Sequence, residues 1–348
     1  MTEDRKRARL IYNPTSGQEI IKKNIAEVLD VLEDIGYETS AFQTTPEPLS
    51  AQKEAERAAK AGFDLIIAAG GDGTINEVVN GVASLDKRPR LAIIPTGTTN
   101  DYARALKIPM GDPVAAAQII AKNETIHMDI GRAFGDKYFI NIAAAGTLTE
   151  LTYSVPSEVK TRLGYFAYVA KGIEMFPKTK VRPVRITHDQ GVFEGEVSLI
   201  FVALTNSIGG FEQLAPDTKL DDGNFTLILV KTDKLFDMLG LLIQAINGGQ
   251  HVSDVNIEYL KTSKLRLEVL DDQEPFMLNL DGEYGGDTPV ELQVCHHHIE
   301  FFVNRDEISQ KFISKTETNK KRKNKKCITT LCAFIIIARM ENTILALL

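Results

Sequence analysis

The sequence predicts an α/β fold with an N-terminal parallel-sheet domain and a C-terminal, largely antiparallel β domain. Strand and helix patterns alternate through the first ~130 residues, which is the signature of a parallel sheet. After Asp129 strand patterns dominate instead. The chain has 348 residues, 43% of them hydrophobic, which suits two ordinary domains with separate cores.

Four strands are expected in the first domain, each followed by a helix. The first helix has its apolar residues at helical spacing and ends at Gly36, which suits a left-handed cap. Ser50 is expected to cap the second helix, and the third helix to begin at Ile75. The strands cover residues 7–12, 37–44, 63–69 and 91–95, and the helices cover residues 21–35, 50–61, the stretch from 75, and the stretch up to 106.

The second domain is expected to be largely antiparallel β structure with two helices, near residues 160–176 and 235–247. Residues 189–191 read as a hairpin turn. The expected strands cover residues 138–144, 184–187, 192–204, 225–230, 265–270, 276–280, 290–294 and 299–303.

Charge and cysteine content limit the classes of function. The net charge of −7 and the pI of about 5.5 argue against a nucleic-acid-binding protein. The three cysteines form no C-x-x-C pair, so a reducing, cytosolic setting is expected. The N-terminus lacks the apolar segment of a signal peptide, and no apolar run reaches the ~20 residues that span a bilayer.

The C-terminal tail differs in composition from the rest of the chain. Residues 320–326 are almost all basic, and a short apolar stretch follows. A solvated, disordered tail is the first interpretation, and a reversible anchor on anionic lipid is the alternative.

A glycine-rich loop, Gly70-Gly-Asp-Gly-Thr74, joins a buried strand to a helix. Glycines let a backbone approach an anion, and helix N-termini receive phosphate oxygens. The spacing matches neither the dinucleotide fingerprint nor the P-loop. Asp72 in the middle of the loop requires a neutralising cation or arginine, and Arg104 is a candidate.

Two further loops, 13–17 and 96–98, also follow strands of the parallel sheet. The carboxyl ends of parallel strands share one edge, so we expect the three loops to meet there. Together they predict a nucleotide cradle, whereas a single glycine turn would be weak support.

In combination these motifs resemble the soluble bacterial diacylglycerol kinases, within the superfamily of sphingosine and ceramide kinases. The resemblance covers residues 7–305 and rests on N-P-T-S-G (13–17), G-G-D-G-T-I-N-E-V-V-N-G (70–81), P-T-G-T-T-N-D (95–101), M-D-I-G (128–131), K-L-D-D-G (219–223) and L-D-G-E-Y-G-G (280–286). It implies an ATP-binding α/β domain at residues 1–128 and a β-sandwich domain at residues 129–305 whose end returns to the first domain. The active site is expected in the cleft between them, and residues 306–348 form the tail.

The resemblance implies an ATP site and a polar network that supports phosphoryl transfer. Asp72, Asp101 and Arg104 match the network. The ATP site matches Asn13, Pro14, Thr15, Ser16, Gly17, Thr44, Gly70, Gly71, Asp72, Gly73, Thr74, Ile75, Asn76 and Thr98.

The family places its general base in the D-G-E motif, which here contains Asp281 and Glu283. A positioned base helps because the acceptor hydroxyl has a high pKa. We favour Glu283 as the formal base, with Asp281 essential beside it. From the pattern alone, the same residues read as an acidic turn in solvent.

The resemblance also implies a structural Mg²⁺ site. Its expected ligands are the Lys219 carbonyl, the Asp222 carboxylate and the Asn224 carbonyl, with Asp129 reached through water. One carboxylate with carbonyls and waters suits Mg²⁺. Without the resemblance, residues 221–224 read as an ordinary turn.

Three consecutive histidines, His296 to His298, suggest a metal site at first sight. Successive side chains on a strand point to opposite faces, so we expect edge-strand surface here and not a chelate.

The resemblance implies phosphorylation of diacylglycerol to phosphatidic acid, which returns diacylglycerol to phospholipid synthesis. ATP and Mg²⁺ are the implied cofactors, and a cytoplasmic protein at the anionic inner face of the membrane is the implied setting. In the family, basic residues hold that surface, and Lys23 and Lys171 keep the charge whereas Gln18 stands where a lysine can occur. The resemblance also allows a homodimer. The alternatives are an NAD kinase, a kinase acting on a sphingoid base or another lipid, and a nucleotide sensor without catalysis.

Overall fold

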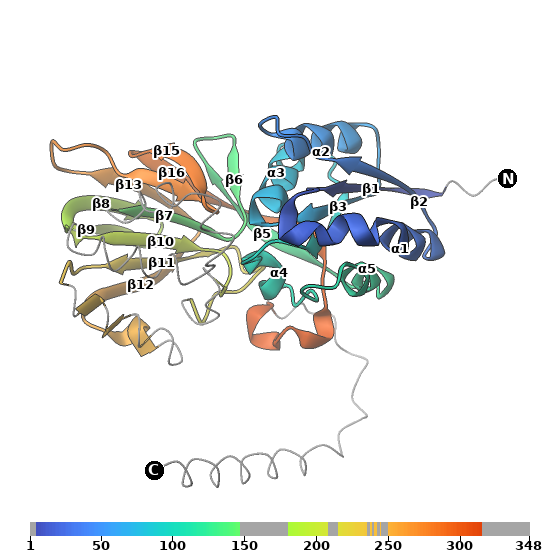
Figure 1. Cartoon of the computed structure of the whole chain (residues 1–348). Coiled ribbons are helices and arrows are strands. Elements are labelled where there is room, and N and C mark those ends of the chain that lie inside the picture. Colours follow the sequence, from blue (N-terminus) through green and yellow to red (C-terminus); the bar gives the residue numbers. More distant parts are fainter. Residues whose placement is uncertain are drawn as a thin grey trace, which may run out of the picture. The chain divides into compact units, whose positions relative to one another are not determined.

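The structure, a computed structural model, describes residues 5–146, 180–207, 215–234, 237–238, 240–241, 244 and 250–314 (Figure 1). Within this part of the chain the strands form a ten-stranded and a six-stranded sheet. The strands are β1 (Lys6–Tyr12), β2 (Tyr37–Gln43), β3 (Leu65–Gly70), β4 (Arg90–Pro95), β5 (Thr125–Ala133), β6 (Lys137–Phe139), β7 (Ile142–Gly146), β8 (Arg182–His188), β9 (Gly191–Val197), β10 (Leu199–Ala203), β11 (Phe225–Val230), β12 (Ile257–Thr262), β13 (Lys264–Val269), β14 (Met277–Leu280), β15 (Glu283–Asp287) and β16 (Val290–Phe302). The α-helices are α1 (Ile20–Asp34), α2 (Ser50–Lys60), α3 (Asp72–Ala83), α4 (Asp101–Ala105) and α5 (Pro113–Ala121), and the 3-10 helices are Ser16–Glu19, Gln250–Ser253, Arg305–Glu307 and Gln310–Phe312.

The N-terminal part is the expected parallel sheet, in the order β2-β1-β3-β4. Strand β3 is completely buried, as its continuous apolar sequence predicts. Helices α1 and α5 pack together on one face of this sheet, and α2 and α3 pack together on the other (Figure 1). Gly36 ends the first helical segment with a φ of 93°, the left-handed conformation predicted for it.

Strand β16 joins the parallel sheet to the β part of the chain. Its first residues pair with β13, β5 runs beside it, and Phe301 pairs in parallel with Leu91 of β4. The large sheet therefore continues from the parallel strands into β13, β8 and β9. The expected domain boundary at residues 128 and 129 falls inside β5, and the domain limits stay a prediction.

The C-terminal part is an antiparallel sandwich. The far end of the large sheet faces the six-stranded sheet, whose order is β12-β11-β10-β7-β14-β15. The apolar core between them takes side chains from both sheets, among them Ile186 and Leu265 from the large sheet and Val202 and Phe225 from the small one. The fold class predicted from the sequence is confirmed.

Several boundaries differ from the sequence prediction for identifiable reasons. The segment expected as one strand at 192–204 is two strands in different sheets, which separate at Ser198. The segment at 138–144 is interrupted at Ile140 and Asn141, where the Asp281 carboxylate takes the backbone N–H groups. Helix α5 and strands β5, β12 and β15 were not anticipated.

Of the two helices predicted for the second domain, one can be compared with the structure in part and the other not at all. The one near residues 160–176 lies outside the described residues, as does Lys171. Of the one near 235–247, the described residues 237, 238, 240, 241 and 244 are helical. Among the helices that the structure describes, none is both long and apolar enough to cross a membrane.

Candidate active site

The three edge loops, residues 13–17, 70–74 and 96–98, meet at the carboxyl edge of β1, β3 and β4, as predicted. The backbone N–H of Asn13 donates to the carbonyl of Ala69 at 2.9 Å, and that of Thr96 donates to the carbonyl of Gly70 at 2.9 Å. These bonds tie each loop to the strand end next to it. Thr44 joins the same edge through a 2.9 Å bond from its N–H to the carbonyl of Tyr12.

Glycines allow the loops to touch. A Cβ atom on Gly17, whose φ is 53°, would overlap the carbonyl oxygen of Thr96. A Cβ on Gly97 would lie 2.5 Å from the Cα of Gly71. Neither position has room for a side chain, so these glycines hold the loops in backbone contact. Gly73 differs, because a Cβ there meets nothing within 4 Å.

The loop at 13–17 is shaped by its own side chains. The Asn13 carboxamide oxygen accepts from the backbone N–H and the hydroxyl of Thr15, both at 3.0 Å. Such a turn replaces backbone bonds with a side-chain acceptor. Of the remaining members, Pro14 precedes Thr15, and Ser16 and Gly17 are the first residues of the 3-10 helix before α1.

Helix α3 begins at Asp72, three residues earlier than the sequence predicts. Gly71 is its N-cap residue, and the first N–H bonded within the helix is that of Ile75, to the Gly71 carbonyl. The N–H groups of residues 72–74 are therefore at the helix start, where helices leave donors for anions. The predicted residues 70–76 thus run from the end of β3 through the first turn of α3.

Asp72 lies in an electrostatically costly position. Its carboxylate accepts from the backbone N–H of Asn100 at 2.8 Å. Burial, reinforced by the negative charges of Asp101 and Asp281, raises the pKa of Asp72 to about 6. A bound cation would relieve this repulsion.

The loop after β4 is held by Asn100, which the sequence did not single out. Its side-chain oxygen accepts from the N–H of Gly97 at 3.0 Å, and its side-chain amide donates to the carbonyl of the same residue at 2.6 Å. Thr98 is left exposed at the tip. The left-handed conformation of Asn100, with a φ of 49°, is one that asparagine tolerates well.

Asp101 and Arg104 lie on the short helix α4. Asp101 is buried and accepts from the hydroxyl of Ser207 at 3.0 Å. The Nε of Arg104 donates to the carbonyl of Thr99 at 2.9 Å. Within the described part of the chain Arg104 makes no ion pair with Asp72, so the direct pairing considered from the sequence is absent there.

Asp281 is enclosed by donors. Its carboxylate accepts from the N–H groups of Ile140 at 2.7 Å and of Asn141 and Ile142 at 2.9 Å, and from the Asn76 side-chain amide at 2.9 Å. A carboxylate has about four lone-pair positions. All of them are used here. Burial raises the pKa of Asp281, and these hydrogen bonds oppose the rise.

Glu283 differs from Asp281 although only Gly282 separates them. Asp281 and Gly282 have φ values of 52° and 99° and form the two-residue turn between β14 and β15, in which Leu280 pairs with Glu283. Glu283 follows this turn with an exposed side chain. The two carboxylates therefore have different environments.

A polar seam connects α3 to β6 and to the Asp281 turn. Asn80 donates its amide to the Tyr138 carbonyl at 2.9 Å, and its side-chain oxygen accepts from the Tyr138 N–H at 2.9 Å. Asn76, one helical turn earlier, makes the bond to Asp281. The sequence signal was present, because two asparagines four residues apart share one face of helix α3.

Glu77, also on helix α3, has a structural role that the sequence did not predict. Its carboxylate accepts from the backbone N–H of Ala51 at 2.9 Å. It therefore caps helix α2. Ser50, the predicted cap, is the first residue of α2 and its hydroxyl accepts from the Thr45 N–H at 3.0 Å, so that prediction is wrong.

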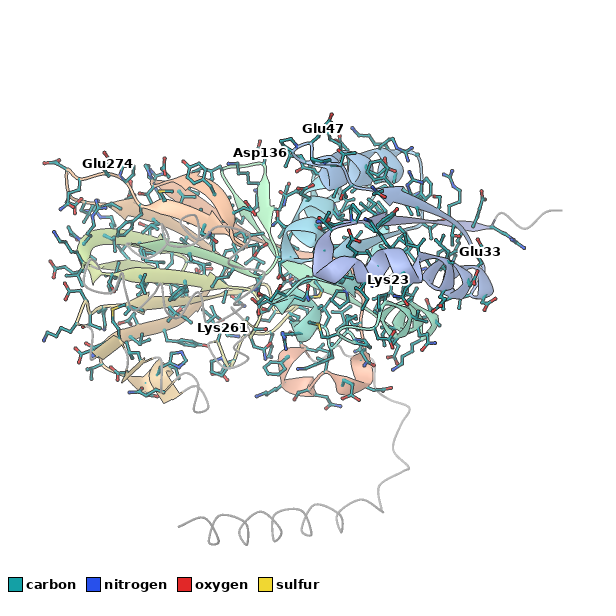
Figure 2. The ribbon with its side chains drawn as sticks, viewed as in Figure 1. Lys23, Glu33, Glu47, Asp136, Lys261 and Glu274 are labelled. Atoms are coloured by element: carbon teal, nitrogen blue, oxygen red, sulfur yellow. The ribbon has the colours of Figure 1, made fainter. Side chains whose placement is uncertain are left out.

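The predicted Mg²⁺ ligands lie together around a loop next to β5. The N–H of Gly223 donates to the Asp129 carboxylate at 2.6 Å, and the N–H of Asn224 donates to that of Asp222 at 3.1 Å. Asp222 also pairs with Lys261, labelled in Figure 2, at 2.8 Å. Lys219 precedes Leu220, whose carbonyl accepts from the Asp129 N–H at 2.9 Å.

The histidine run is not edge-strand surface with alternating rings, and this prediction is wrong. β16 lies inside the large sheet, between β4 and β13. Its register with β5 shifts between Cys295 and Ile299, and the rings of His296 and His297 stack with centroids 3.7 Å apart. A β-bulge adds a residue and breaks the alternation.

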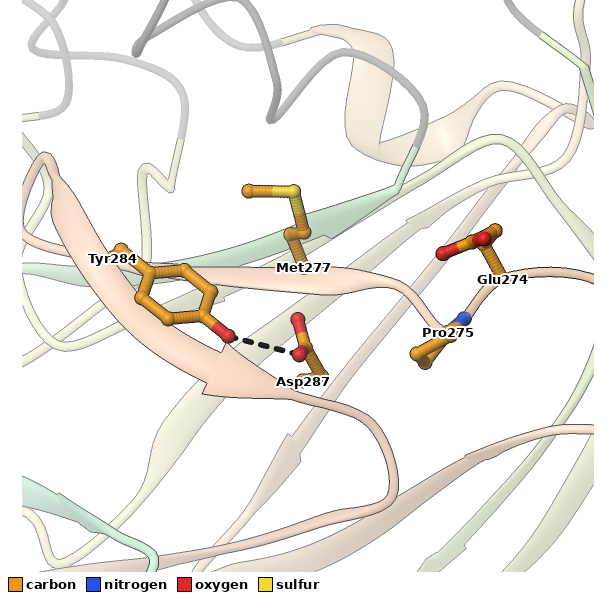
Figure 3. Close-up of a pocket in the computed structure, with 5 residues that line it drawn as sticks. All are labelled: Glu274, Pro275, Met277, Tyr284 and Asp287. Atoms are coloured by element: carbon orange, nitrogen blue, oxygen red, sulfur yellow. Dashed lines mark hydrogen bonds between the residues drawn. The ribbon is translucent and has the colours of Figure 1, made fainter.

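A surface pocket lies beside strands β14 and β15. It is lined by Glu274, Pro275, Met277, Tyr284 and Asp287. Figure 3 shows the Tyr284 hydroxyl donating to Asp287, at 2.8 Å. The pocket contains none of the predicted site residues.

Comparison with known proteins identifies both parts of the chain. The diacylglycerol kinase catalytic domain matches residues 7–133, and the YegS C-terminal NAD kinase beta sandwich-like domain matches residues 148–303.

Relatives and solved structures give the same result. A diacylglycerol kinase of Bacillus subtilis (strain 168) is 50% identical over 305 residues, which cover 88% of this chain and 99% of the relative. One from Staphylococcus aureus (strain bovine RF122) is 46% identical over 310 residues, which cover 89% of this chain and 96% of the relative. The crystal structure of a diacylglycerol kinase from Bacillus anthracis str. Sterne superposes with a TM-score of 0.73 at 29% identity, covering 87% of this chain and 99% of that one.

Proposed function

The chain belongs to the diacylglycerol kinase family, and we propose that it transfers the γ-phosphoryl group of ATP to the free hydroxyl of diacylglycerol. The product, phosphatidic acid, returns the lipid to phospholipid synthesis. The observation that carries the proposal is the bond between Asn76 and Asp281, because it links the glycine-rich phosphate loop to the D-G-E turn.

ATP is the phosphoryl donor of this family, and the three edge loops are where we place it. The N–H groups of residues 72–74 point from the start of α3, where phosphate oxygens are accepted. Gly73 leaves open space, so a ligand can approach its backbone. The other predicted ATP contacts, from Asn13 to Gly17 with Thr44 and Thr98, border the same edge.

Glu283 is the proposed general base. Its exposed carboxylate can take the proton of the acceptor hydroxyl as the hydroxyl oxygen bonds to the γ-phosphorus and the bond to the β,γ-bridging oxygen breaks. ADP leaves with that electron pair.

Asp281 has no free lone pair in this arrangement, so we assign it the role of a positioning residue. It fixes the turn that carries Glu283 relative to helix α3.

Asp101 and Arg104 support the centre indirectly. Asp101 raises the pKa of Asp72, and both residues lie on the helix that follows Asn100, the donor to Asp72. Phosphoryl transfer depends mainly on positioning and charge neutralisation. This network contributes positioning, and a bound cation would supply the neutralisation.

The residues present fit Mg²⁺. Asp222 provides a carboxylate and residues 219 and 224 provide carbonyls, the oxygen ligands that Mg²⁺ prefers, and the Asp129 carboxylate would hold a water of the ion. Burial raises the pKa of Asp129, which marks a carboxylate that a cation would stabilise. When bound, the ion would supply charge neutralisation and would replace Lys261 as the partner of Asp222.

The setting of the reaction follows from the substrate. We place the enzyme at the cytoplasmic face of an anionic membrane, since diacylglycerol resides in a bilayer and Lys23 on α1 is exposed (Figure 2). The basic run at 320–326 adds attraction for anionic lipid. We also propose a homodimer, which the family resemblance allows. Sedimentation of the purified chain would measure its oligomeric state.

An assay with labelled ATP that offers diacylglycerol, sphingosine and NAD side by side tests the proposal. Labelled phosphatidic acid is the expected product. NAD serves as a comparison because the matched C-terminal domain is described as NAD kinase-like. Label found only in NADP or only in sphingosine phosphate would overturn the assignment of the acceptor, and no labelled product at all would overturn catalysis.

A further inference from the structure

The β-bulge in β16 places two histidine rings on the same side of the strand. The register shift between Cys295 and Ile299 accommodates His297 with a φ of 49°, a left-handed value that is uncommon for residues other than glycine. The rings of His296 and His297 then lie with an interplanar angle of 26°. Backbone strain of this kind persists only where the surrounding structure holds it.

A buried carboxylate faces these rings. Asp129 is 2% exposed, and its Oδ1 lies 2.8 Å from the Nδ1 of His296 and 2.8 Å from the backbone nitrogen of His297. One ring nitrogen of each histidine and one Asp129 oxygen lie within 4.8 Å of one another. Both histidine side chains are exposed, so an ion can reach them from solvent.

The hydrogen bonds assign the free nitrogen of each ring. The Nε2 of His297 lies 3.2 Å from the carbonyl oxygen of Asp221, which can only accept, so the proton is on Nε2 and the lone pair is on Nδ1. In the same way, the Nδ1 of neutral His296 carries the proton shared with Asp129. An imidazole that donates to a carbonyl on one side and binds a metal on the other is a recurrent arrangement in metalloproteins.

We propose that Asp129, His296 and His297 form a binding site for a divalent transition-metal ion of the Zn²⁺, Co²⁺ or Ni²⁺ class. The ion takes the place of the proton between the His296 Nδ1 and Asp129, and that proton moves to the free Nε2 of His296. The ion also binds the Nδ1 of His297 and completes its coordination with water. Ligand bonds of about 2.1 Å place tetrahedral ligands roughly 3.4 Å apart, which rotation of the two exposed rings can reach. His127, whose ring centroid is 6.4 Å from that of His297, is a further imidazole next to the site.

This site differs in chemistry from the proposed Mg²⁺ loop. Two imidazole nitrogens favour transition metals, whereas the loop at residues 219–224 offers oxygen ligands for a hard cation. The two sites share Asp129. If the Mg²⁺ assignment in the proposed function holds, the two ions therefore compete for one carboxylate.

The test uses the full chain without a histidine tag, with Cys327→Ser and Cys332→Ser in every protein so that the thiols of the tail cannot bind metal. Co²⁺ is added under titration and followed by its visible absorption, and Zn²⁺ affinity is measured by competition with a chromophoric chelator. One equivalent of ion is expected. His296→Asn and His297→Asn should each weaken metal binding at least tenfold. Loss of a residue that only supports a ligand already lowers metal affinity about tenfold or more, and loss of the ligand itself should lower it at least as much.

His298→Asn is the matched control. The ring of His298 bonds instead to the carbonyl of Ala83, at 2.8 Å, so its replacement should leave the affinity unchanged. Asparagine suits position 297 because it tolerates the left-handed conformation. Thermal unfolding without metal should show that all three variants are folded.

Three results would overturn the site: no Co²⁺ absorption in the parent chain, unchanged affinity in His296→Asn and His297→Asn, or equal loss in His298→Asn. The readout is metal binding and not turnover, so any of these results leaves the lipid kinase assignment untouched.

Discussion

The side-chain amide of Asn76 donates to the carboxylate of Asp281 at 2.9 Å, across 205 positions of sequence. Asn76 lies in the first turns of the helix that begins in the glycine-rich loop, and Asp281 lies in the turn that carries Glu283. The bond therefore sets the distance between the loop proposed to hold the phosphates and the proposed base.

Removing this bond should lower both turnover and stability. Asn76→Ala leaves a buried carboxylate with one donor fewer, which costs about 1–3 kcal/mol in the free energy of unfolding. Misplacement of Glu283 should lower kcat more than it raises the KM for ATP. Steady-state kinetics and denaturant unfolding measure the two effects.

The pairing itself is tested by a double-mutant cycle with Asp281→Asn. We expect the two substitutions to be less than additive, since they remove the same bond. Fully additive effects on kcat would show that the two residues act independently.

Asp72 should make stability depend on pH. Its pKa is raised from 3.8 to about 6, so the folded state holds the proton more tightly than the unfolded state does. The free energy of unfolding therefore falls as the pH rises from about 4 to about 6. Asp72→Asn removes this loss and keeps an acceptor for the Asn100 N–H.

Without nucleotide, Asp72→Asn should be more stable than the parent by about 1–3 kcal/mol at pH 8 and by nothing at pH 4. Denaturant unfolding at both values measures the difference. Asp136→Asn, at an exposed turn labelled in Figure 2, is the control and should change stability at neither pH. A difference that is the same at pH 4 and pH 8 would contradict the raised pKa.

A substitution at Gly73 should affect ligand binding without affecting the packing of the protein. Because a Cβ there meets no atom of the protein, Gly73→Ala should fold with unchanged stability or gain up to about 1 kcal/mol from helix propensity. The methyl group would lie where phosphate must approach, so ATP affinity should fall at least tenfold.

Gly97→Ala provides the contrast, since its Cβ would lie 2.5 Å from the Cα of Gly71 and should lower the melting temperature. Nucleotide titration and thermal unfolding of the two variants measure these effects. Parental ATP affinity in Gly73→Ala would show that the phosphates do not bind at this turn.

Sequence patterns were sufficient for the parallel sheet and for the meeting of its loops. Continuous apolar strands such as β3 and the shared carboxyl edge of parallel strands are local properties with one geometric outcome. The start of α3 was predicted late because Gly73 and Asp72 weaken helix propensity, whereas the structure uses them in the first turn.

What depends on distant contacts could not be read from the sequence. Asp281 and Glu283 are equivalent by pattern, and donors far along the chain, the backbone of residues 140–142 and the Asn76 amide, distinguish them. The alternation rule failed at His296 because a bulge leaves no clear sequence signal. Glu77 as the cap of α2 likewise required knowing that α2 and α3 are neighbours.

The most direct test of the account is the turnover of Glu283→Gln with diacylglycerol and labelled ATP. The exposed side chain bonds to no described residue, so the fold and ATP affinity should be unchanged while kcat falls by about 10²–10⁴. Glu291→Gln, at an exposed residue of β16 that pairs with Arg266 away from the proposed site, is the control and should retain parental kcat. Phosphatidic acid formed by Glu283→Gln at the parental rate would contradict the assignment of Glu283 as the base.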